Sequence, residues 1–223
     1  MIEHLLHPRI VENKDWATIL FVFSFVLITI TKSTNENRFS DFMNLIFSDK
    51  YSKVYRNSGH LISGFTLSLF VVQAISFAFF IQLALNIFGF ASKTDYILYI
   101  QILTFVIFFI LSKYLIEKII ATAFNIEEFV EQFNLQKVTY RTYIGLLILP
   151  FNIILFYHES ISTIIPQIII AILLVSNILT YLLSIKNYQK LIFSKLFYFI
   201  LYLCTLEIAP YFLMYYWYTK TSA

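Results

Sequence analysis

The stretch FYFILYLCTLEIAPYFLMYYW, residues 197–217, decides the class of fold that this sequence predicts. It is apolar throughout except for one ionisable side chain, Glu207, which Pro210 follows closely. A run of this length crosses the hydrocarbon core of a bilayer as a helix. A carboxylate near the middle of that core is costly unless it is protonated, paired or hydrated. We therefore expect the other segments to surround Glu207 and to supply its partner.

The composition of the whole chain agrees with a membrane protein. Of 223 residues, 59% are hydrophobic and only 13% are charged, which excludes a soluble globular domain and a disordered chain. The net charge of +3 comes without a basic run of five or more residues, so nothing indicates a nucleic acid partner. The single cysteine, Cys204, excludes an intramolecular disulfide bond. Residues 1–15 lack the pattern of a signal peptide, so we expect the first apolar segment to stay in the mature protein.

Six apolar segments predict an all-α membrane protein with about six transmembrane helices in an antiparallel bundle. They form one polytopic domain over residues 1–223 and are residues 16–31, 61–91, 96–124, 143–157, 163–185 and 196–218. The first and the fourth are close to the shortest length that spans a bilayer. Pro150 has no amide hydrogen, so the fourth span is expected to kink there.

Two further segments, residues 38–56 and 126–140, carry apolar side chains at helical spacing on one face and charged side chains elsewhere. In the first segment, Phe39, Phe42 and Met43 belong to the apolar face. Helices of this kind lie in the plane of the membrane interface. The sequence therefore predicts two amphipathic interfacial helices, both on the same side of the membrane.

The distribution of Lys and Arg predicts the orientation in the membrane. The segment before the first span, those between spans two and three and between four and five, and the tail carry 4 Lys and Arg residues in total. The alternate segments, with the span ends that adjoin them, carry 12. The positive-inside rule then predicts an inner-membrane protein with both termini in the periplasm and both amphipathic helices in the cytoplasm.

Five polar side chains fall at a similar depth on five different spans, when depth is counted at about 1.5 Å per residue. They are Glu207, Asn152, Asn177, Gln73 and Gln101. One interpretation is that these groups form interhelical hydrogen bonds that hold the bundle together. The other is that they line a polar pocket in which Glu207 carries a proton or anchors a cation or a polar headgroup. Both interpretations stay open from the sequence.

Three basic side chains, Arg56, His60 and Arg141, fall at the inner mouth of the predicted bundle. They could contact lipid phosphates or act as ordinary interface anchors. The sequence contains no zinc-protease, nucleophile-elbow, phosphate-loop or CxxC motif. We therefore expect no metal and no cofactor, and the absence of a catalytic motif argues against an enzyme.

Three motifs resemble a known family when they are taken together. They are YLCTLEIAP at residues 202–210, GLLILP at residues 145–150 and RFSDF at residues 38–42. In this respect the chain resembles an uncharacterised integral inner-membrane family of Bacteroidota that is catalogued only as a domain of unknown function. The resemblance covers nearly the whole chain and implies an inner-membrane protein of about this length. It implies no activity and no catalytic residue.

Two functional hypotheses follow. The first is a non-enzymatic subunit or scaffold of an envelope or secretion assembly, which would bind membrane-protein partners or a second copy of the chain. The alternative is a small-molecule, proton-coupled or lipid transporter that uses a mid-membrane polar pocket around Glu207. Both hypotheses require the lipid bilayer as the surrounding medium.

Overall fold

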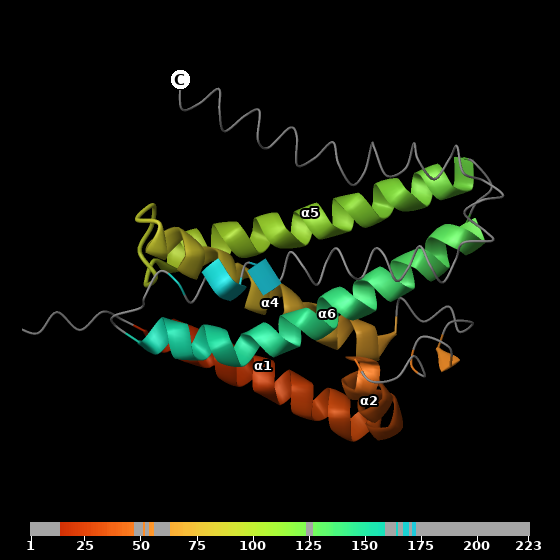
Figure 1. Ribbon diagram of the computed structural model, residues 1–223, viewed down its shortest axis with the longest axis horizontal. Coiled ribbons are helices and arrows are strands. Elements are labelled where there is room, and N and C mark those ends of the chain that lie inside the picture. Colours follow the sequence, from red (N-terminus) through yellow and green to blue (C-terminus); the bar gives the residue numbers. More distant parts are fainter. Residues whose placement is uncertain are drawn as a thin grey trace, which may run out of the picture.

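The computed structural model describes residues 14–46, 51, 54–55, 63–123, 127–158, 164, 167–169 and 171–172, and these residues form helices and no strand (Figure 1). The helices in chain order are α1 (Asp15–Thr34), α2 (Glu36–Met43), the 3-10 helix η1 (Asn44–Ile46), α4 (Gly64–Ile87), α5 (Tyr96–Ala123) and α6 (Glu127–Tyr157).

Four of these helices are long and apolar enough to cross a membrane. They are α1, α4, α5 and the Asn134–Tyr157 part of α6. The predicted spans 16–31, 61–91 and 96–124 correspond to α1, α4 and α5. The predicted span 196–218, and all but a few residues of the predicted span 163–185, lie outside the described residues.

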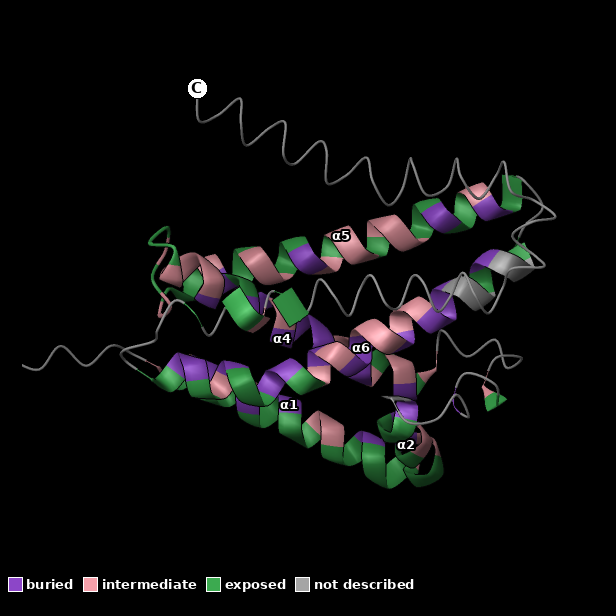
Figure 2. Ribbon diagram, viewed as in Figure 1, coloured by how far each residue is buried: buried purple, intermediate pink, exposed green. Residues whose placement is uncertain are grey.

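The central helix of the described part is α4, which contacts α1, α5 and α6. It carries apolar residues on all sides, and such a helix is stable where other helices surround it. Figure 2 shows the buried residues concentrated where α1, α4 and α6 meet, whereas α5 carries mostly exposed and intermediate residues. The exposed side chains of α5 include Phe105 and Phe108, as expected for a helix that faces lipid.

Aromatic rings join these four helices at the end of the bundle where α1 begins. The ring of Phe79 on α4 lies 4.3 Å from that of Phe21 on α1 and 4.5 Å from that of Tyr99 on α5. Phe156 on α6 completes the cluster, with its ring 5.8 Å from that of Phe79. All four side chains are at most 4% exposed. Ring stacking and edge contacts therefore fix the relative positions of the helices at this end.

The sequence predicts an interfacial helix over residues 126–140 and a separate span over residues 143–157. In the structure one continuous helix, α6, runs from Glu127 to Tyr157. The prediction of two elements was wrong because no glycine or proline interrupts residues 135–144. Of the glutamates that suggested an interface, Glu127 and Glu131 are exposed on α6. Further along the same helix, Asn134, Gln136 and Thr139 are at most 8% exposed, so polar residues of this segment are buried in the protein as well.

The amphipathic helix predicted over residues 38–56 is shorter in the part that the structure describes. It consists of α2 followed by η1, which ends at Ile46, and the remainder lies largely outside the described residues. The apolar face of α2 packs on protein: Phe42 is 1% exposed and makes edge contacts with the rings of Phe65 and Tyr143. Helix α2 therefore docks onto α4 and α6.

Candidate functional site

Two of the predicted polar residues meet at the interface between α4 and α6. The Asn152 Nδ2 group donates to the Ser76 carbonyl oxygen at 2.7 Å and to the Ser76 Oγ at 3.2 Å. Further along the same interface, the Thr142 hydroxyl donates to Gln73 Oε1 at 2.8 Å. Asn152 and Gln73 are both 0% exposed. These bonds are of the interhelical kind that the first interpretation of the polar residues requires.

The two helices approach each other closely here because residue 145 is a glycine. A Cβ atom added to Gly145 would lie 2.8 Å from Gln73 Cγ and 3.1 Å from Gln73 Cα. Small residues allow helix backbones to come this close within membranes. Gln73 Nε2 and Asn152 Oδ1 find no hydrogen-bond partner among the described residues. The interface is therefore a close contact between two helices that leaves one polar atom of Gln73 and one of Asn152 without a described hydrogen-bond partner.

The other members of the predicted set are not brought to this interface by the described structure. Gln101 is exposed on α5 in the described structure. Counting residues gives a depth but not the face of the helix, and the grouping of Gln101 with Asn177 and Glu207 stays a prediction. Asn177 and Glu207 lie outside the described residues, as do Arg56 and His60. Arg141 lies on α6 and is partly buried.

Arg38 of α2 belongs to the RFSDF motif but was not among the residues predicted for a site. Its Nε donates to the Tyr51 hydroxyl at 3.4 Å, and its two terminal nitrogens donate to Ser63 Oγ at 3.1 Å and Thr66 Oγ1 at 3.5 Å. The guanidinium carbon lies 4.5 Å from the centre of the Phe65 ring and 5.1 Å from that of Tyr55. These contacts hold α2 against the first turn of α4.

All the groups that hold Arg38 are neutral. Burial raises the pKa of Tyr51 although the nearby Arg38 acts to lower it, so the phenol stays protonated at neutral pH. Among the described residues, no carboxylate forms an ion pair with Arg38. The guanidinium also has more N–H groups than these three bonds use, and two of the bonds are long. Arg38 therefore keeps both its charge and part of its donor capacity for another acceptor.

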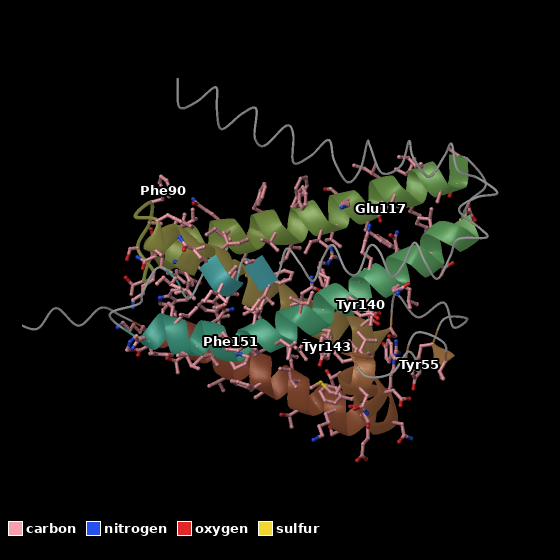
Figure 3. The ribbon with its side chains drawn as sticks, viewed as in Figure 1. Tyr55, Phe90, Glu117, Tyr140, Tyr143 and Phe151 are labelled. Atoms are coloured by element: carbon pink, nitrogen blue, oxygen red, sulfur yellow. The ribbon has the colours of Figure 1, made fainter. Side chains whose placement is uncertain are left out.

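Arg38 borders a cleft of about 860 Å³ where the end of α1, the start of α2 and the start of α4 meet. Ligand sites in proteins commonly have volumes in this range. In Figure 3 this end of the bundle carries Tyr55, Tyr140 and Glu117, and Phe90 marks the opposite end. The cleft is lined by Ile30, Thr31, Ser33, Thr34, Asn35, Glu36, Asn37, Arg38, Tyr55, Ser63, Gly64, Phe65 and Ser68.

The first turn of α4 adds a second favourable feature for an anion. Ser63 caps this helix by accepting a hydrogen bond from the Thr66 amide at 3.3 Å. Other amides of a first helical turn have no partner within the helix, and the helix dipole favours negative charge there. Gly64 has open space around its α-carbon and lines the cleft. An anion in the cleft would therefore meet both the Arg38 guanidinium and backbone N–H groups.

A second charged contact joins α5 and α6. Lys137 Nζ donates to Glu117 Oε1 at 2.9 Å, and the two side chains are 11% and 4% exposed. Each charge compensates the other, so this pair holds the two helices together and leaves no free acid or base. Among the described residues, no group of three His, Cys, Asp or Glu side chains could hold a metal ion.

Comparison with known proteins identifies the family. The family model described as "Domain of unknown function (DUF4271)" matches residues 17–218. The chain belongs to this family. All three motifs that carry the resemblance fall within the matched range of DUF4271, which confirms the expected relationship to a family without a known function. No curated protein and no solved structure gives a significant match to the chain.

Proposed function

We propose that this DUF4271 protein is a multi-pass inner-membrane protein that binds a phospholipid headgroup in the cleft beside Arg38. The observation that carries the proposal is a guanidinium held by three neutral hydroxyl groups, with no carboxylate partner in the described structure, at the edge of a polar cleft. Arginine binds phosphate through paired hydrogen bonds that are shorter and stronger than those to neutral groups. A lipid phosphate would supply the acceptor that Arg38 lacks.

The position of the cleft favours a lipid over a soluble anion. The cleft lies where α1 ends and α4 begins, and both helices are long and apolar enough to cross a membrane. The headgroup layer lies just outside the hydrocarbon core, at the ends of such helices. Ile30, which lines the cleft, is 53% exposed, so an acyl chain can lie against it while the phosphate reaches Arg38.

The proposed orientation places the cleft on the cytoplasmic side, and we retain six spans with both termini in the periplasm. Of the described basic residues, Lys14 and Lys93 are at the end where α1 begins and α4 ends. Those that belong to the end with the cleft are Lys32, Arg38, Lys113, Lys118, Lys137 and Arg141. The positive-inside rule is the physical reason for reading this end as cytoplasmic.

This proposal is a form of the alternative hypothesis of a transporter or lipid-handling protein. It differs in the site, which lies at the membrane interface and not in the middle of the membrane. Gln73 and Asn152, which were candidates for a mid-membrane pocket, hydrogen-bond directly across the α4 and α6 interface. The role as a subunit or scaffold of an envelope or secretion assembly stays a prediction. Its test is affinity purification from the native host, in which a subunit must retain a stoichiometric partner.

Native mass spectrometry of the full chain in mild detergent tests lipid binding. We expect the protein to retain added synthetic phospholipids, and Arg38→Gln to lower retention at least about tenfold, as expected for the loss of charged hydrogen bonds. Lys32→Gln is the matched control: Lys32 is exposed near the cleft but does not line it. Equal retention by the wild type and Arg38→Gln would refute the proposal, and equal losses in both variants would show a general charge effect.

A further inference from the structure

The lining of the cleft carries both signs of charge. Glu36, in the first turn of α2, and Arg38 both line it, and Glu36 is exposed. Neither side chain forms an ion pair with another described residue. The amides of Asn35 and Asn37 and the hydroxyl of Thr31 add further oxygen acceptors. A ligand in the cleft would therefore meet a donor-rich cationic side and an acceptor-rich anionic side.

We infer that the cleft selects a phospholipid whose headgroup joins the phosphate to a primary ammonium group, an inference that rests on the proposed function. In such a headgroup, two carbon atoms separate the phosphate ester from the ammonium. Side chains two residues apart on an α-helix do not face each other, but Glu36 and Arg38 both line the cleft, so a headgroup inside it meets one charge of each sign. The phosphate binds the Arg38 guanidinium, and the ammonium donates to Glu36 and the neighbouring oxygen acceptors.

The charge balance of the lining disfavours a headgroup that is only negative. The charges of Glu36 and Arg38 cancel at a distance, so they do not attract a net anion into the cleft. A headgroup with a phosphate and uncharged hydroxyl groups would pair with Arg38 but would offer Glu36 only neutral donors, which bind a carboxylate more weakly than an ammonium does and leave its charge uncompensated beside the phosphate. Like charges at this range repel each other, and this repulsion gives selectivity against the wrong lipid.

The lining also distinguishes a primary ammonium from a trimethylammonium group. Proteins recognise quaternary ammonium ions with the faces of aromatic rings. The two aromatic residues of the lining, Phe65 and Tyr55, already have the Arg38 guanidinium over their rings, at 4.5 Å and 5.1 Å. A trimethylammonium group also has no N–H to donate to Glu36. The cleft therefore suits phosphatidylethanolamine better than phosphatidylcholine.

Competition between lipids with identical acyl chains tests this inference on the full chain. Native mass spectrometry would compare retained phosphatidylethanolamine, phosphatidylglycerol and phosphatidylcholine. We expect the wild type to prefer phosphatidylethanolamine roughly two- to fivefold, which is the effect of one exposed charge pair. Glu36→Gln should abolish the preference over phosphatidylglycerol. Glu131→Gln, which removes an exposed carboxylate of α6, should keep the preference.

The outcomes separate the two proposals. If the wild type retains all three lipids equally, or prefers phosphatidylglycerol, while Arg38→Gln still weakens retention, the headgroup inference is overturned and the lipid site stands. If Arg38→Gln changes no retention, the proposed function fails as well. The wild-type comparison needs no variant, so it stays informative even if a substitution prevents folding. A preference that persists in Glu36→Gln would overturn the role of that carboxylate.

Discussion

Gly145 is the position at which a single methyl group should most clearly weaken the contact between α4 and α6. In Gly145→Ala, the new Cβ would lie 2.8 Å from Gln73 Cγ and 3.1 Å from both Cα and Cβ of Gln73. The Cα atom belongs to the backbone of a buried helix, so a side-chain rotation alone cannot remove the clash. Either the two helices separate or Gln73 moves away from Thr142, to which it is hydrogen-bonded.

Two unfavourable effects and one favourable effect determine how much the free energy of unfolding changes. Overpacking a well-packed interface costs about 1–3 kcal/mol. Loss of the bond between Thr142 and Gln73 adds about 0.6 kcal/mol, the average for an interhelical hydrogen bond in a membrane. Alanine is favoured over glycine inside a helix by about 1 kcal/mol, which offsets part of this. We therefore expect Gly145→Ala to lower the free energy of unfolding by about 1–2 kcal/mol.

Unfolding of the purified protein in mixed detergent micelles, with rising denaturing detergent, would measure this change. Gly64→Ala is the matched control, because a Cβ at Gly64 meets nothing within 4 Å. We expect the control to unfold like the wild type within a few tenths of a kcal/mol, since surface substitutions rarely exceed about 0.5 kcal/mol. A Gly145→Ala variant as stable as the wild type would show that α6 does not approach α4 as closely as described.

Three further outcomes are expected. Glu117→Gln removes the carboxylate that binds the Lys137 ammonium and should lower the free energy of unfolding by about 3–5 kcal/mol. Combining it with Lys137→Met should recover part of this loss, and the same unfolding assay measures both variants. Burial raises the pKa of Tyr51 above its usual 10.0, so Tyr51 should not affect stability below that pH, and the folded protein should lose stability as the pH rises further. Tyr51→Phe should reduce this alkaline loss of stability. Melting curves from about pH 9 to about pH 11 would measure it. A reporter fused after Lys32 should give a cytoplasmic signal, and a reporter fused after Lys93 should give a periplasmic signal. The reverse pattern would overturn the proposed orientation of the helices in the membrane.

The ends of α1, α4 and α5 lie within four residues of the predicted limits, because long apolar runs report the thickness of the bilayer directly. The same signal failed for α6. The charged residues Glu127 and Glu131 suggested a separate interfacial helix, but they belong to the same continuous helix as the apolar run, in which Asn134 and Gln136 are buried. A hydrophobic pattern therefore locates an apolar span but does not show whether the helix continues beyond it.

The candidate polar residues show the same limit. Gln73 and Asn152 were selected by depth and do meet the same interface, whereas Gln101 was selected in the same way and is exposed. Arg38 was visible only as part of the RFSDF motif. Its partners Ser63 and Thr66 follow 25 and 28 residues later, beyond the range of any local periodicity. That no described carboxylate pairs with Arg38 therefore becomes apparent only once the helices are packed.

The dependence of α6 on α4 has a consequence for how the protein is made. The Asn134–Tyr157 part of α6 is the least apolar of the four described helices that could cross a membrane, and its Thr142 and Asn152 side chains hydrogen-bond to α4, which precedes it in the chain. Alone in lipid, those amide and hydroxyl groups would lack partners. During synthesis α4 enters the membrane first, so α6 has a polar partner when it leaves the ribosome. Correct insertion of α6 should therefore depend on Gln73 and Ser76 already being in place.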